Sequence, residues 1–154
     1  MQLLKSSKDF QLNKTTLVNL RLIAHLGQLL AIIIVKFYFN FEFSQYLYCL
    51  IIVGIGIGTN IFLHFQTKDN QLDNFQSTIY LAYDIIQLGL LLYLTGGVTN
   101  PFIILIIVPS VFSSKYLNLW TSIFLASLTL LILLIISFNY LGLPYPEGQR
   151  LSVP

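Results

Sequence analysis

Five polar side chains stand out because they lie inside long apolar stretches, where a polar group needs a partner. Arg21, His25 and Gln28 follow one another at spacings of four and three residues, which is one face of a helix. Asp84 and Gln87 repeat the spacing of three in a later stretch. Such groups form hydrogen bonds between helices or bind a ligand or a proton. We expect Asp84 to pair with Arg21 or His25.

The depth of these groups in the first apolar run decides where they point. Arg21 lies close enough to the start of the run for its long side chain to extend to the membrane surface. His25 and Gln28 lie deeper and are expected to point into a helix bundle. Their function is either to hold the bundle together or to sense a ligand or proton.

A short uncharged segment between two apolar runs is the second candidate site; it consists of Gly96, Gly97, Val98, Thr99, Asn100, Pro101 and Phe102. The two glycines predict a helix end, because glycine adopts left-handed backbone angles without steric cost. Asn100 and Pro101 predict a helix start, since Asn caps free amides and proline at the first position loses no hydrogen bond. The segment is therefore a tight helix hairpin, with or without a ligand.

The elements that must position these residues are membrane helices. The chain has 154 residues, of which 56% are hydrophobic and only 9% are charged, whereas about 25% are charged in soluble proteins. Its apolar runs of about twenty residues are long enough to cross the hydrocarbon core of a bilayer. These values predict an all-α, polytopic transmembrane bundle. The small, dispersed net charge of +2 argues against a nucleic-acid partner.

Five spans are predicted, over residues 17–39, 45–65, 77–94, 101–114 and 119–141. If the spans alternate, most lysines fall on the side of the N-terminus, and the positive-inside rule places that side in the cytoplasm. Residues 1–16 then form a cytoplasmic leader. The segment 96–102 and the tail 142–154 lie outside. A chain that stops there is expected to be a fragment that lacks a sixth span.

Other residues are given structural roles. Cys49 is expected to be a buried apolar residue, and no disulfide or metal-ligand spacing is present in the sequence. Gly54 and Gly58 form the Gly-x-x-x-Gly pattern of close helix packing. Neither His25 nor His64 has the neighbours of a phosphoacceptor. No catalytic machinery is recognisable in the sequence.

The sequence resembles the membrane sensor domain of the RegB/PrrB family of redox-responsive histidine kinases. That family has the heptapeptide Gly-Gly-x-x-Asn-Pro-Phe in an external loop between its third and fourth spans, and residues 96–102 reproduce it completely. The first span, with Arg21 and Gln28, and the third, with Asp84 and Gln87, are also similar. The resemblance covers roughly residues 17–150.

The resemblance implies a protein of the bacterial inner membrane that senses ubiquinone or another quinone, with contacts from Gly96, Gly97, Thr99, Asn100, Pro101 and Phe102. The Thr99 hydroxyl, the Asn100 amide and free amides at the start of the fourth helix are the expected donors to the quinone carbonyls. Phe102 is expected to pack on the ring, with Tyr93 or Trp120 as further candidates.

The resemblance also implies parts beyond this chain. The full protein is expected to be a homodimer whose missing cytoplasmic region binds ATP, phosphorylates itself on histidine and passes the phosphate to a response regulator. A small transporter or channel subunit that uses Asp84, Gln87 and His25 is the alternative function. A purely structural assembly subunit is a third.

Overall fold

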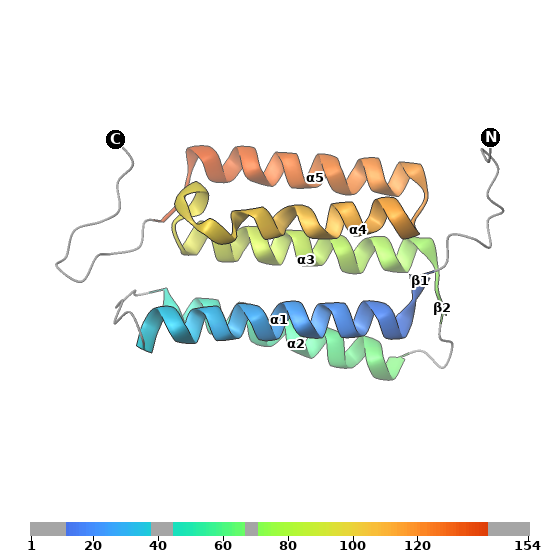
Figure 1. The fold of residues 1–154 in the computed structure, drawn as a ribbon, viewed down its shortest axis with the longest axis horizontal. Helices are drawn as coiled ribbons and strands as arrows, with labels where there is room; N and C mark the ends of the chain where they lie inside the picture. The colour runs from blue at the N-terminus through green and yellow to red at the C-terminus, as the bar shows by residue number, and fades with distance from the viewer. Residues whose placement is uncertain (1–11, 38–44, 67–70, 142–154) are drawn as a thin grey trace.

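The computed structural model describes residues 12–37, 45–66 and 71–141. Its elements, in chain order, are β1 (Leu12–Asn13), α1 (Lys14–Phe37), α2 (Tyr46–Gln66), β2 (Gln71–Leu72), α3 (Asn74–Leu94), the 3-10 helices η2 (Gly97–Thr99) and η3 (Pro101–Ile107), α4 (Val108–Tyr116) and α5 (Leu119–Phe138). Figure 1 shows the helices side by side in one bundle, with α1 and α2 in one layer and α3, α4 and α5 in the other. The predicted all-α, polytopic membrane fold is confirmed.

Four of the five predicted spans are long, continuous helices. α1, α2, α3 and α5 are long and apolar enough to cross a membrane, whereas the apolar segment Pro101–Tyr116 is shorter. That segment also differs from a simple α-helix, because it begins as seven residues of 3-10 helix and becomes α-helical only at Val108. Pro109 lies at this change. Proline has no amide hydrogen, so the α-helical bond to residue 105 cannot form there.

Hydrogen bonds between chain segments fix the two ends of the bundle. At one end β1 pairs with β2, and the Lys14 ammonium donates to the backbone oxygen of His64 at 3.1 Å. At the other end the Leu141 amide donates to the Tyr93 oxygen at 2.8 Å, so α5 ends beside the end of α3. The helices therefore alternate in direction, as the predicted topology requires. The two short strands were not predicted.

Three predicted segments lie wholly or largely outside the described residues. They are the leader 1–16, the segment 40–44 between the first two predicted spans, and the tail 142–154. The cytoplasmic placement of the N-terminus stays a prediction.

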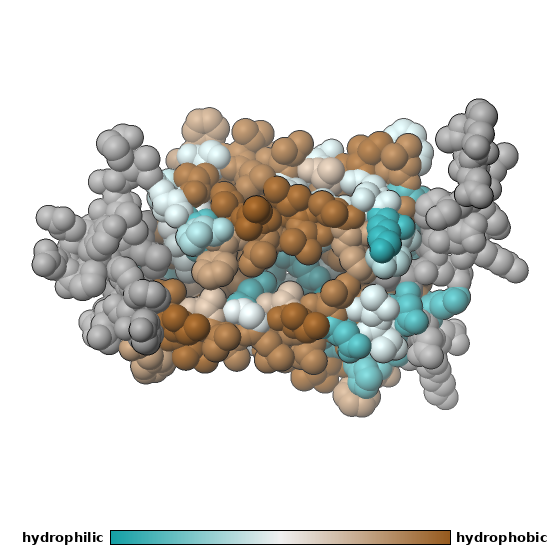
Figure 2. Space-filling model, in the orientation of Figure 1, coloured by the Kyte–Doolittle hydropathy of each residue, from teal (hydrophilic) through white to brown (hydrophobic). Residues whose placement is uncertain are grey.

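The outer surface of the bundle is apolar over most of its length, as a surface that faces lipid must be. Figure 2 shows hydrophobic residues along the bundle and hydrophilic ones concentrated toward one end. Many large apolar side chains are exposed on the outside of the bundle, including Ile23, Phe62, Ile104 and Leu134. The buried core lies between α3, α5 and their neighbours, with Ile85 and Leu125 fully buried.

The glycines of α2 do not pack as predicted. Gly54 and Gly58 are exposed, and a Cβ atom at either position would meet no atom within 4 Å outside its own helix. The close contact is made instead by Gly56, which faces the bundle interior. The prediction for Cys49 was correct, since its side chain is completely buried in an apolar cluster.

Candidate functional site

A cavity of about 450 Å³ lies between α1 on one side and η3 and α4 on the other, with α3 as its floor. Figure 2 shows this hollow between two hydrophobic rims, with hydrophilic residues visible at its bottom. The walls are mainly apolar and include Leu20, Leu88, Leu105, Val108 and Phe112. The lining also includes all five intramembrane polar residues predicted to matter: Arg21, His25, Gln28, Asp84 and Gln87.

An ion pair between α1 and α3 forms part of the lining of the cavity. The Arg21 Nε donates to both carboxylate oxygens of Asp84 at 2.9 Å, and Nη2 donates to Oδ1 at 2.8 Å. The same Nη2 is 3.1 Å from the Thr59 hydroxyl on α2. The guanidinium carbon lies 5.0 Å from the centre of the Tyr80 ring, within the range of a cation–π contact. Arg21 on α1 is thus hydrogen-bonded to both α2 and α3.

This geometry confirms one prediction about Arg21 and overturns another. Asp84 pairs with Arg21, one of its two expected partners. Arg21 does not extend to the membrane surface, because only 3% of it is exposed and its charge is matched inside the bundle. The carboxylate supplies the partner that a surface position would otherwise provide.

A chain of hydrogen bonds continues from the ion pair along the cavity. The His25 ring contacts the Arg21 backbone oxygen through Nδ1, and Nε2 lies 3.2 Å from the Gln87 side-chain oxygen. The Gln87 amide nitrogen then donates to the Gln28 oxygen at 3.1 Å. His25 and Gln87 are buried, whereas Gln28 is half-buried. His25 and Gln28 therefore point inward, as predicted.

Gly56 leaves the space that the hydrogen-bonded side chains of His25 and Gln87 occupy. A Cβ atom built at Gly56 would collide with the His25 ring and with the Gln87 side-chain oxygen. The absence of a side chain on α2 therefore lets α1 and α3 bring these two groups together.

We expect Gly56→Ala to lower the free energy of unfolding by about 1–3 kcal/mol, because the added methyl group overpacks the polar chain. Gly54→Ala is the matched control, since its new methyl group points into open space. Thermal unfolding of both variants in lipid nanodiscs measures the difference. Equal melting temperatures for the two variants would contradict the role given to Gly56.

The heptapeptide 96–102 forms the hairpin that the sequence predicts. Gly96 and Gly97 have φ values of 108° and 56°, in the left-handed region that favours glycine. The Asn100 side-chain oxygen accepts from the Phe102 amide at 2.9 Å and caps the next helix. The helix that starts at Pro101 is a 3-10 helix rather than the expected α-helix.

Most donors of this hairpin are engaged within it. The Asn100 side-chain nitrogen donates to the hydroxyl and the backbone oxygen of Thr95, at 2.7 and 3.2 Å. The Thr99 hydroxyl donates to the Gly96 oxygen at 2.7 Å. The backbone amides of Thr99, Asn100 and Ile103 also have partners inside the hairpin. The groups that the sequence suggested as donors to a ligand thus hold the turn itself.

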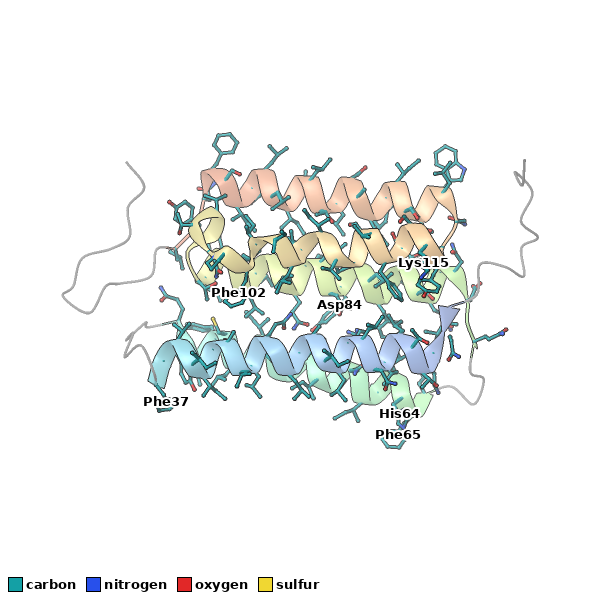
Figure 3. All side chains as sticks on the ribbon, in the orientation of Figure 1. Phe37, His64, Phe65, Asp84, Phe102 and Lys115 are labelled. Atoms are coloured by element: carbon teal, nitrogen blue, oxygen red, sulfur yellow. The ribbon has the colours of Figure 1, made fainter. Side chains whose placement is uncertain are left out.

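Two residues of the heptapeptide, Asn100 and Phe102, line the cavity, together with the preceding Thr95. Figure 3 shows Phe102 on the side of the hairpin that faces α1. Gly96, Gly97, Thr99 and Pro101 shape the turn and are not part of the lining.

The other aromatic candidates are placed differently. Trp120 is 80% exposed at the start of α5, the end opposite the hairpin, so it cannot pack on a ring held at the hairpin. Tyr93 is half-buried next to the hairpin but does not line the cavity. Phe112 on α4 lines the cavity. Phe112 was not predicted from the sequence, because nothing in its apolar surroundings distinguishes it from the other phenylalanines of the chain.

The contact of Thr59 with Arg21 was not predicted, because a threonine in an apolar helix usually bonds the backbone of its own helix. Thr59 also does so, to the Gly56 oxygen at 2.8 Å.

Within the described ranges, no three His, Cys, Asp or Glu side chains gather in a metal-binding group.

Comparison with known proteins adds a family relationship. Residues 12–150 match the family described as the PilS-like transmembrane domain. The chain is 36% identical over 139 residues to the sensor histidine kinase RegB of Cereibacter sphaeroides, which covers 90% of this chain and 30% of that protein. The chain therefore spans about a third of the length of this relative. No solved structure matches.

Proposed function

Since this chain belongs to the family of PilS-like transmembrane domains and is related to a sensor histidine kinase over 90% of its length, we propose that it senses the redox state of a membrane quinone. It is a multi-pass protein of the bacterial inner membrane. The quinone occupies the cavity between α1 and η3–α4, and the heptapeptide forms the outer end of that site.

The observation that carries the proposal is the combination of an apolar cavity with polar groups at both ends. A volume of about 450 Å³ lies in the range of small-molecule sites, which hold an apolar ligand body and orient it with a few polar groups. A quinone has a flat ring with two carbonyl acceptors and a lipid-soluble tail. Phe102 and Phe112 supply aromatic surface for the ring, while Gln28 and Asn100 supply polar atoms.

The position of the cavity suits a ligand that arrives from the bilayer. Its rims are formed by α1 and by η3 and α4, whose outward residues Ile23, Ile104 and Val108 are exposed and apolar. A lipid-soluble ligand reaches such an opening without crossing water.

A sensor must bind the two redox forms differently, because only differential affinity shifts a conformational equilibrium. Reduction converts quinone acceptors into hydroxyl donors, which changes their fit to fixed polar partners. A coupling free energy of about 1–3 kcal/mol is typical of such regulation.

The signal is proposed to pass to a histidine kinase region outside this chain that binds ATP and phosphorylates a response regulator. The homodimer is also a proposal. The alternative of a transporter or channel subunit draws no support from the family relationship.

We expect an azido-benzoquinone to label residues of α1, η3 or α4 when the chain is irradiated in lipid nanodiscs, with excess unlabelled quinone preventing the reaction. Phe102→Ala removes aromatic surface from the cavity and should reduce specific labelling about three- to tenfold. Phe62→Ala is the matched control, because Phe62 is exposed on α2 and does not line the cavity. Labelling spread evenly over the lipid-facing surface, and unaffected by Phe102→Ala, would refute the site.

A further inference from the structure

We infer that the chain His25–Gln87–Gln28 is a reversible hydrogen-bond relay whose direction decides whether the cavity offers a donor or an acceptor to its ligand. The inference rests on the proposed function, since it concerns the ligand of the same cavity. It assigns the ligand's polar head to the Gln28 side chain on α1 rather than to the heptapeptide.

The hydrogen-bonding capacity of the two cavity ends supports this assignment. At the hairpin, the Asn100 amide nitrogen already donates to two acceptors of Thr95. On α1, Gln28 accepts one bond from Gln87, and its own amide nitrogen has no protein partner among the described residues. Gln28 is also only half-buried and lines the cavity. The group that remains available to a ligand is therefore the Gln28 carboxamide.

The direction of the relay is linked to the proton on His25. In the arrangement described above, His25 donates to Gln87, and Gln87 donates to Gln28. Because the other ring nitrogen faces the Arg21 carbonyl, an acceptor, both nitrogens must carry hydrogen. The imidazole is then protonated, and the amide group of Gln28 points its donors into the cavity.

Rotating both carboxamides by half a turn leaves the heavy atoms in place and reverses the relay. Gln28 then donates to Gln87, Gln87 donates to the His25 Nε2, and the imidazole is neutral. The Gln28 oxygen now faces the cavity as an acceptor. The two directions differ by one proton, which His25 exchanges with the aqueous phase.

The surroundings of His25 permit this change. The charged groups nearest it are Arg21 on its own helix and Asp84 on α3, which neutralise each other, and the titratable Tyr80 and Tyr83 of α3 lie beside Arg21. The α2 helix faces His25 with the uncharged Gly56. The η3 and α4 walls of the cavity contribute apolar residues: Leu105, Val108, Pro109 and Phe112.

The relay therefore responds to the difference in hydrogen-bonding capacity between quinone and quinol. A quinone carbonyl is an acceptor and binds the direction in which Gln28 donates and His25 is protonated. A quinol hydroxyl can donate as well as accept, so the direction in which Gln28 accepts and His25 is neutral binds quinol but not quinone. Binding of quinone therefore takes up as much as one proton more than binding of quinol, and no electron is transferred.

The experiment measures the affinities of a short-tailed benzoquinone and of its quinol for the full chain in lipid nanodiscs, without oxygen and relative to empty nanodiscs. The pH is varied over the range in which histidine changes charge, about 5 to 8. The ratio of quinone to quinol affinity should fall with rising pH, by up to about tenfold per pH unit, because the two directions of the relay differ by one bound proton.

Gln87→Met breaks the relay between His25 and the ligand, and it should make the ratio independent of pH while both forms still bind. Gln28→Met removes the contact itself; it should abolish the pH dependence and lower both affinities about three- to tenfold. It also provides the test if Gln87→Met does not fold. Gln71→Met, at the exposed position of strand β2, is the matched control and should behave as the unmodified chain.

Two results would overturn the relay while leaving the quinone site intact. They are binding of both forms with a ratio independent of pH in the unmodified chain, and a pH dependence that survives both substitutions. Failure of the unmodified chain to bind either form above the level of empty nanodiscs would refute the quinone site as well.

Discussion

Replacing Asp84 by leucine is expected to lower the free energy of unfolding by about 3–5 kcal/mol, the usual cost of removing one partner of a buried ion pair. The substitution leaves the Arg21 guanidinium, only 3% exposed, without its carboxylate. It also removes three of the hydrogen bonds that join α1 to α3. Unfolding of the purified variant, followed by helical circular dichroism in mixed micelles, measures the loss.

The double substitution Arg21→Met with Asp84→Leu separates the unpaired charge from the lost packing. Replacing a complete buried pair by apolar residues is often neutral or stabilising, so the double variant should regain most of the stability. A double variant as unstable as Asp84→Leu alone would show that the loss comes from packing and not from charge.

Substituting Gly97 by alanine is expected to be comparably severe, because two costs coincide at this position. Its φ of 56° is strained for a residue with a Cβ, at about 1–3 kcal/mol. The new methyl group would also collide with the Tyr140 side chain, and such overpacking costs about 1–3 kcal/mol. The hairpin would shift and displace Asn100 and Phe102 from the cavity.

Photolabelling and thermal unfolding of Gly97→Ala report these two effects. Gly58→Ala is the control, since its new methyl group meets no atom within 4 Å, Gly58 does not line the cavity and it is in the α-helix α2, where alanine is favoured. If Gly97→Ala unfolded at the temperature of the unmodified chain and was labelled equally, the tight turn would not be needed for the site.

The membrane fold follows from the sequence because length and polarity decide it locally. Apolar runs of about twenty residues have few alternatives to helices in a bilayer. The hairpin was predictable for the same reason, since Gly96 and Gly97 encode the backbone angles and Asn100 encodes the cap. These features depend only on neighbours in the chain.

Features that depend on other helices were not predictable in this way. The sequence offered Asp84 two partners, and only packing selects Arg21 and removes it from the membrane surface. The three glycines of α2 look alike in sequence, yet Gly56 alone of them touches the polar chain. The cavity is formed by surfaces of α1, α3, η3 and α4 that meet only in the folded bundle.

The seven residues of η3 affect how the fourth segment fits the thickness of the bilayer. A 3-10 helix rises about 2.0 Å per residue and an α-helix about 1.5 Å, so η3 and α4 together extend about 28 Å. The same sixteen residues as an α-helix would reach only about 24 Å, short of the roughly 30 Å hydrocarbon core. The stretched backbone thus reduces the hydrophobic mismatch of this segment. It lets a helix too short by residue count hold the hairpin and the turn between α4 and α5 near opposite membrane surfaces.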